Sequence, residues 1–94
     1  MSVLPEAEVQ KRLPELPGWK LVDGALEKKW KFGSQFLDGI EFVNDVAEIA
    51  EEMNHHPDIG IHWTEVTLRI WTHDEGGITE RDVELARTIE KEIG

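Results

Sequence analysis

The stretch from Gln35 to Asn54 constrains the fold of this 94-residue chain more than any other. Its apolar residues recur every three or four positions and form two adjacent stripes, as is typical of an amphipathic helix. One stripe is Phe36, Ile40, Val43, Ala47 and Ala50, and the other is Phe42, Val46, Ile49 and Met53. Ser34 is expected to cap the start of this helix, and Pro57 to end it near His55, because proline cannot continue the ladder of helical hydrogen bonds.

Four further segments alternate apolar and polar residues with period two, which is typical of half-buried strands. They are residues 18–22, 25–32, 59–63 and 66–73. Asp23-Gly24 separates the first two segments with a dipeptide suited to a tight hairpin turn, and Thr64-Glu65 lies between the other two. In the last segment, the residues expected to face the core are Val66, Leu68 and Ile70.

Two helices are predicted to flank these elements. The first runs from Pro5 to Leu13, because proline is favoured at an early helical position. Thr79 and Asp82 resemble a capping box that opens the last helix, whose apolar stripe is Val83, Ala86, Ile89 and Ile93. The order helix, two strands, helix, two strands, helix favours an α+β fold, with an antiparallel sheet and the helices on one face. A chain this short supports one core, so residues 1–94 are expected to form a single domain.

The charge balance excludes several classes of partner. Twenty Asp and Glu residues against 10 Lys and Arg give a formal charge of -10, which repels phosphate backbones and anionic lipid, so we expect no direct nucleic-acid or membrane partner. The absence of cysteine excludes disulfides, thiolate nucleophiles and cysteine-type zinc sites. The first residues lack the apolar run of a secretory signal, and no stretch reaches the roughly 18 apolar residues of a membrane span. A cytoplasmic protein is therefore expected.

Three of the four histidines lie close together in the stretch EEMNHHPDIGIHW. His55 and His56 alone form a poor chelating pair, because adjacent side chains diverge. Further ligands for a metal site would be His62, His73, Asp58 and Asp74. A histidine metal site stays an alternative, although this pattern has low specificity.

Acid-base chemistry fits these residues better. A histidine at a helix C-terminus feels the negative end of the helix dipole, and Glu51, one turn before His55, adds negative charge, so one imidazole can be held protonated as an acid. Another can stay neutral as a base, which makes His73, at a strand end, the natural second partner. Solvated polar residues at a helix end remain the alternative, and His62, on an alternating strand, is expected at the surface.

The spacing of these residues resembles the signature of the pterin-4a-carbinolamine dehydratase family. The matching elements are Glu51, His55-His56-Pro57, Trp63, His73 and Asp82. The resemblance also includes Gly18-Trp19, the first hairpin, the helix that runs into MNHHP and the segment GITERDVELA. It covers roughly residues 3–93.

This resemblance implies dehydration of 4a-hydroxytetrahydropterins to quinonoid dihydropterins plus water, which recycles tetrahydrobiopterin after aromatic amino-acid hydroxylation. It implies no metal and no organic cofactor. The family fold is a four-stranded antiparallel sheet with three helices on one side. Members assemble as homodimers that often pair into homotetramers, and an exposed Trp63 or Trp71 would be covered by a partner subunit in such an assembly.

By matching positions, the resemblance makes His55, His56 and His73 the catalytic set. We expect His55 and His73 to exchange protons with the departing 4a-hydroxyl and with ring N5, and His56 to hold the pterin. The expected substrate-binding residues are Glu51, Asp74 and Trp19. Glu51 would orient His55 or bind the amino-pyrimidine edge, with a solvated helix carboxylate as the alternative. Asp82 matches the signature but is expected chiefly as a helix cap.

The alternative function is a non-catalytic dimeric interaction or assembly module on the same fold. Some bacterial relatives of this fold have been assigned scaffold or assembly-chaperone roles. The presence of His55, His56 and His73 together argues for the enzyme, because a scaffold has no need of all three.

Overall fold

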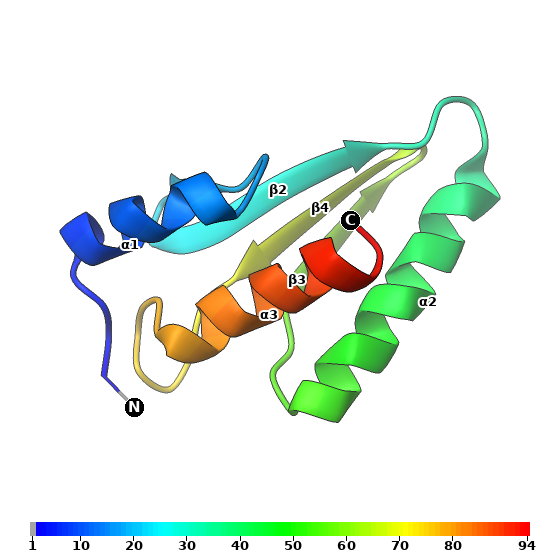
Figure 1. Ribbon diagram of the computed structural model, residues 1–94. Coiled ribbons are helices and arrows are strands. Elements are labelled where there is room, and N and C mark those ends of the chain that lie inside the picture. The colour runs from blue at the N-terminus through cyan, green and yellow to red at the C-terminus, as the bar shows by residue number, and fades with distance from the viewer. Residues whose placement is uncertain (1) are drawn as a thin grey trace.

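The computed structural model describes residues 2–94, which contain a four-stranded antiparallel sheet and three α-helices (Figure 1). In chain order the elements are α1 (Glu6–Arg12), the 3-10 turn η1 (Leu13–Glu15), β1 (Lys20–Val22), β2 (Ala25–Lys31), α2 (Phe36–Met53), β3 (Asp58–His62), β4 (Glu65–Ile70) and α3 (Glu80–Glu92). The predicted α+β class and the predicted order of helices and strands are confirmed. In the part of the chain described, no helix is both long enough and apolar enough to cross a membrane.

The sheet has the strand order β1-β2-β4-β3, and each neighbouring pair is antiparallel. The β1–β2 hairpin turns at Asp23 and Gly24, whose φ angles of 46° and 79° are the left-handed values that a tight two-residue turn requires. The β3–β4 hairpin turns at Trp63 and Thr64, where Trp63 has a φ of 52° and is 73% exposed. Between the two hairpins α2 returns the chain along the sheet, so β3 runs parallel to β2 and lies at the edge, with β4 between them and antiparallel to both.

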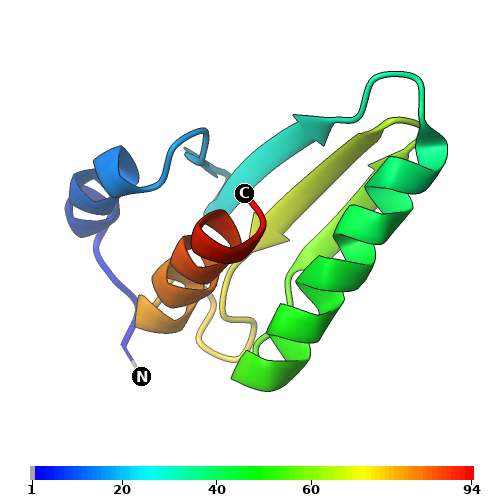
Figure 2. The ribbon, with the colours of Figure 1, turned by 45° about the vertical axis from the view of Figure 1, so that its right-hand side comes forward.

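Two helices, α2 and α3, lie side by side on one face of the sheet and run in opposite directions (Figures 1 and 2). The β4 residues that face them are fully buried, as predicted: Val66, Leu68 and Ile70. The stripe of α2 that is turned to the core consists of Phe42, Val46 and Ile49, with Gly39 and Ala50. The other predicted stripe is partly exposed, because a helix on a sheet buries only roughly a third of its circumference.

The start of α2 differs from the prediction. Gln35, not Ser34, precedes the first helical residue, and no side chain caps the helix there. Ser34 lies in a turn that the Gln35 N–H closes by donating to the Phe32 carbonyl oxygen at 3.2 Å. The prediction of Ser34 as the cap was therefore wrong by one position, because the turn from the sheet to the helix layer uses this residue.

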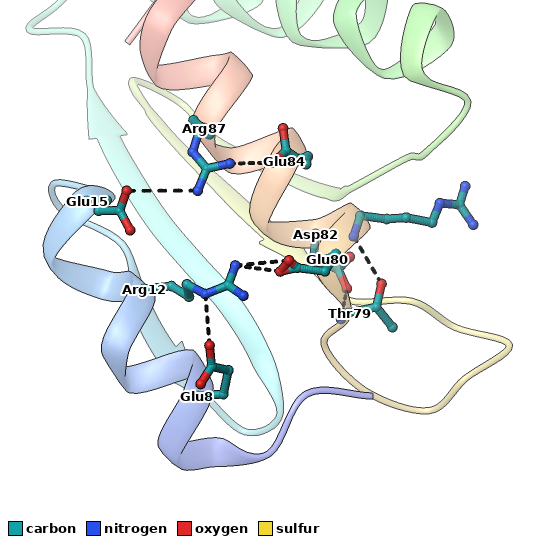
Figure 3. A network of polar contacts seen from close by, with 9 residues as sticks. Glu8, Arg12, Glu15, Thr79, Glu80, Asp82, Glu84 and Arg87 are labelled. Carbon is teal, nitrogen blue, oxygen red and sulfur yellow. Dashed lines mark hydrogen bonds and ion pairs between the residues drawn. The ribbon is translucent and has the colours of Figure 1, made fainter. Parts of the chain in front are cut away.

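Arg12 anchors α1 on the first turn of α3 (Figure 3). Its Nη1 lies 2.5 Å from Glu80 Oε1, and its Nε donates to Glu8 Oε1 at 3.3 Å. The carboxylate of Glu80, and after it that of Glu8, raises the pKa of the Arg12 guanidinium. The short N-terminal helix is thus tied to the helix that carries Asp82.

The far end of α3 is held by Glu90, whose Oε2 accepts hydrogen bonds from Lys28 Nζ at 2.8 Å and Trp19 Nε1 at 3.0 Å. The side chains of Glu90 and Lys28 are only 14% and 16% exposed. Glu90→Ala therefore removes the acceptor of the Trp19 N–H and the charged partner of Lys28, which keeps the Pro17 carbonyl oxygen as an acceptor. We expect the free energy of unfolding, measured by urea denaturation, to fall by about 2–3 kcal/mol. Glu92→Ala, at an exposed position of the same helix, is the control, and equal stability of the two variants would contradict this role of Glu90.

Candidate active site

The end of α2 sets the directions of the two adjacent histidines. Asn54 adopts the left-handed conformation (φ 50°, ψ 43°), which asparagine tolerates better than most residues, and the His55 N–H donates to the Ala50 carbonyl oxygen at 3.1 Å. The last helical residue is Met53, close to the predicted end. His55 turns inward and is 8% exposed, whereas the side chain of His56 is more than half exposed.

A buried carboxylate holds His55. The imidazole Nε2 lies 2.5 Å from Asp82 Oδ1, and Asp82 is fully buried in the first turn of α3. Asp82 also completes the predicted capping box, because its Oδ2 accepts a hydrogen bond from the Thr79 N–H at 2.7 Å. One carboxylate thus caps a helix and binds a histidine. The capping box indicates a carboxylate that points back from the helix, but nothing in the sequence identifies His55 as its partner.

Glu51 contacts His56 and not His55. Its Oε2 forms a hydrogen bond with His56 Nε2, and the two side chains are 76% and 55% exposed. The expectation that Glu51 orients His55 is therefore corrected, because the left-handed turn at Asn54 directs the His55 ring towards α3. Exposed ion pairs contribute little to stability, so the contact bears on the orientation of the His56 ring rather than on the fold.

His73 lies in a short loop that follows β4. A bridge between Thr72 and Gly77 closes this loop, and the His73 ring lies 4.3 Å from the Trp71 ring at an interplanar angle of 40°. The His73 Nε2 is 3.8 Å from Asp58 Oδ1, a longer contact than the other two histidines make. With a side chain that is 59% exposed, His73 is open to a molecule arriving from solvent.

All three predicted catalytic histidines line one cleft of about 230 Å³, between the end of α2, the end of β4 and the start of α3. Its other lining residues are Asn54, Trp71, Asp74 and Arg81. Of the predicted site residues, the structure therefore brings His55, His56, His73 and Asp74 around this cleft, with Glu51 behind His56. Trp71 and Arg81 were not predicted to line this cleft. For Trp71 the alternation of its strand indicated a side chain that points away from the core, whereas nothing in the sequence indicated Arg81.

Trp19 and His62 lie elsewhere. Trp19 is 4% exposed in the core, and its Nε1 donates to Glu90. Glu90 itself lies roughly 13 Å beyond Arg81 along α3, at about 1.5 Å per residue. His62 lines a separate hollow on the outer face of the sheet. The aromatic side chain at the cleft is thus Trp71 and not Trp19, while His62 lies outside the cleft.

Chemistry rather than size distinguishes the histidine cleft. A larger hollow of about 470 Å³, beside the N-terminal segment, has Glu6 and Asp23 as its titratable lining residues and so offers carboxylates alone. The histidine cleft combines imidazoles, a carboxylate, a guanidinium and an aromatic ring. Among residues 2–94, no group of three or more His, Cys, Asp and Glu side chains is arranged so that it could hold a metal ion.

Comparison with known proteins gives consistent matches over the whole chain. The family model described as pterin 4 alpha carbinolamine dehydratase matches residues 2–92. A protein of Mycolicibacterium vanbaalenii that is assigned by name to the pterin-4-alpha-carbinolamine dehydratases is 52% identical over 94 residues, which is 100% of both chains. One from Sulfolobus acidocaldarius with the same assignment is 44% identical and covers 94% of this chain and 96% of its own.

Solved structures agree with these matches. A transcriptional coactivator/pterin dehydratase from Brucella melitensis has a TM-score of 0.89 and 33% identity, covering 99% of this chain and 100% of its own. A pterin dehydratase-like protein identified as a RuBisCO assembly factor in the alpha-carboxysome has a TM-score of 0.64 and 21% identity, covering 82% of this chain and 90% of its own. The second likeness concerns the fold alone.

Proposed function

The chain belongs to the pterin-4-alpha-carbinolamine dehydratase family, a family of hydro-lyases, and from this membership we propose that it dehydrates 4a-hydroxytetrahydropterins by histidine acid-base catalysis. The observation that most directly supports the proposal is that His55, His56 and His73 line one cleft. These imidazoles come from two distant segments, and none of them belongs to the apolar core. Proton chemistry gives a reason for their convergence.

Dehydration needs two proton transfers. One proton must reach the hydroxyl that leaves C4a, so that it departs as water, and another must leave N5, so that the C4a–N5 double bond of the quinonoid dihydropterin can form. Histidine can give or take a proton near neutral pH, and positioned proton transfer accelerates such steps by about 10²- to 10⁴-fold. Two imidazoles that line one cleft can therefore carry out both proton transfers without any cofactor. We place this activity in the recycling of tetrahydrobiopterin.

Each histidine is given a separate role. His55 and His73 exchange protons with the leaving hydroxyl and with N5, because both line the cleft, one held by Asp82 and the other exposed to solvent. His56, whose ring is bonded to the exposed Glu51, holds the pterin at the edge of the cleft. This assignment gives the proton-transfer roles to one imidazole from each of the two segments.

Binding of the flat pterin ring is assigned to three further groups. Trp71 lines the cleft beside His73 and supplies aromatic area for stacking. Asp74 lines the same cleft, and a carboxylate there can accept two hydrogen bonds from an amino-pyrimidine edge. Glu51 acts through His56, so its proposed part is to keep that ring directed at the substrate.

The purified protein is expected to accelerate the disappearance of a 4a-hydroxytetrahydropterin generated by an aromatic amino-acid hydroxylase, measured by the ultraviolet absorbance of the intermediate. His62→Ala serves as the matched control, because His62 is an exposed histidine outside the cleft, and it should be as active as the unmodified protein. If stoichiometric protein gives no acceleration, dehydration is refuted. A pure interaction module on this fold would give that result while still binding its partner.

We also propose that the protein is a homodimer or homotetramer, as the family resemblance implies. In support, large apolar side chains are exposed on β3, the β3–β4 turn and the start of α2: Phe36, Leu37, Ile59, Ile61 and Trp63. Such side chains are costly to leave in water and are typical of surfaces that a partner covers. Light scattering during size-exclusion chromatography should give the mass of two or four chains, and the mass of one chain would exclude this assembly.

A further inference from the structure

A chain of buried hydroxyl groups lies behind the His55–Asp82 pair. Thr72 Oγ1 donates to Asp82 Oδ2 at 2.8 Å, and the hydroxyls of Thr72 and Thr79 lie 2.8 Å apart. Thr72 is 1% exposed, while Thr79 and Asp82 are fully buried. Their polar atoms cannot exchange partners with water, so this arrangement is fixed by the fold. Figure 3 shows Thr79 and Asp82 together at the start of α3.

The direction of each hydrogen bond follows from counting protons. A threonine hydroxyl has one proton, and that of Thr72 goes to the Asp82 carboxylate, so the proton between the two threonines belongs to Thr79. Thr79 Oγ1 in turn accepts from the Arg81 N–H at 3.2 Å. All the bonds in this chain therefore point towards Asp82.

Asp82 consequently faces His55 as an acceptor. Its Oδ2 already accepts from the Thr72 hydroxyl and from the Thr79 N–H, and a carboxylate oxygen only accepts. The remaining oxygen, Oδ1, lies 2.5 Å from His55 Nε2, so the proton of this contact is carried by Nε2. The neutral imidazole must then have its lone pair on Nδ1.

We propose that Thr72 and Asp82 are positioning residues that fix His55 in the Nε2–H tautomer, so that His55 exchanges protons with the substrate through Nδ1. His55 lines the cleft, and in residues 2–94 no hydrogen bond occupies its Nδ1. The role of this nitrogen in dehydration rests on the proposed function. The tautomer itself rests on the hydrogen bonds of the folded chain and is independent of any substrate.

Thr72 also fixes the neighbouring histidine. Its N–H donates to the Gly77 carbonyl oxygen at 2.9 Å, and its carbonyl oxygen accepts from the Gly76 N–H at 2.9 Å. These bonds close the loop that begins with His73, the next residue in the chain. Thr72 thus acts on both histidines. Its hydroxyl sets the tautomer of His55 through Asp82, and its backbone N–H and carbonyl oxygen hold the loop that carries His73.

The kinetic test compares two replacements of Thr72. Thr72→Val keeps the shape but removes the hydroxyl, so it withdraws one donor from Asp82, and we expect kcat for dehydration to fall about 10- to 100-fold with KM changed less than about threefold. Thr72→Ser keeps a hydroxyl and should retain kcat within about threefold of the unmodified protein. An unchanged kcat in Thr72→Val, or equal losses in both variants, would overturn the positioning role.

Nuclear magnetic resonance tests the tautomer without any substrate. Nitrogen-15 shifts of the unmodified protein, with the His55 signals identified by their absence in His55→Gln, should show a protonated Nε2 and an unprotonated Nδ1 for the neutral ring. The opposite tautomer would refute the inference even if the enzyme is active. If the protein has no dehydratase activity but shows the Nε2–H tautomer, the proposed function fails while the fixed tautomer stands.

Discussion

Replacing His73 by alanine is expected to lower kcat for dehydration of a 4a-hydroxytetrahydropterin by about 10²- to 10⁴-fold, the contribution of a positioned proton-transfer group. The free energy of unfolding should change little, because the side chain is 59% exposed and its carboxylate contact is 3.8 Å long. Stopped-flow absorbance of the decaying intermediate measures the rate, and urea denaturation measures the stability. A rate within threefold of that of the unmodified protein would remove His73 from the proposed mechanism.

His55→Ala provides the informative contrast. It removes a proposed proton-transfer group as well, but it also leaves the fully buried Asp82 without its imidazole partner. Removing one partner of a buried hydrogen-bonded pair is costly, so this variant should lose both rate and stability. The difference between the two variants separates a group that acts mainly on the substrate from one that also supports the fold.

Asp82→Ala is expected to lower the free energy of unfolding by about 3–5 kcal/mol, a large share of the about 5–15 kcal/mol typical of a small domain. Three donors lose their acceptor at once, namely the His55 imidazole, the Thr72 hydroxyl and the Thr79 N–H that caps α3. Urea denaturation gives the value. Asp45→Ala, which removes an exposed carboxylate from α2, is the control and should change stability by less than about 0.5 kcal/mol.

Asp82→Asn separates the two roles of Asp82, which are to cap α3 and to fix the tautomer of His55. The amide oxygen can still accept from the Thr72 hydroxyl and the Thr79 N–H, so most of the stability lost in Asp82→Ala should return. Its NH₂ group, however, would donate to His55 Nε2 and force the proton of the neutral ring onto Nδ1. In a Ser-His-Asp triad such an exchange costs kcat about 10⁴-fold, and we expect a loss of at least about 10²-fold here. An Asn variant as active as the unmodified protein would contradict the role of the carboxylate.

The secondary structure could be predicted because its signals are local. Asp23-Gly24 specifies a tight turn by its own backbone preferences, and the alternation from Val66 to Ile70 is visible within a single strand. The two stripes of α2 were equally visible, but which stripe faces the sheet depends on how the helix is rotated on its neighbours. That rotation leaves Phe36 46% exposed, and no local pattern determines it.

The partners within the site could not be predicted, because they depend on tertiary packing. Asp82 lies 27 positions after His55, and the two meet only because α2 and α3 run in opposite directions side by side. Glu51 would face His55 on a continuous helix. The left-handed residue Asn54 ends the helix between them, and Glu51 forms its hydrogen bond with His56 instead. Trp19 came from the family pattern, and a sequence does not reveal whether an aromatic residue faces the core or a cleft.

The capping box of α3 also bears on when, during synthesis and folding, the proposed active site is assembled. All three proposed catalytic histidines precede this 13-residue helix in the sequence, yet the carboxylate that holds His55 belongs to its first turn. During synthesis these imidazoles are therefore made before the carboxylate that holds His55. The proposed activity therefore requires that α3 has docked beside α2, so the onset of turnover would report the docking of this helix.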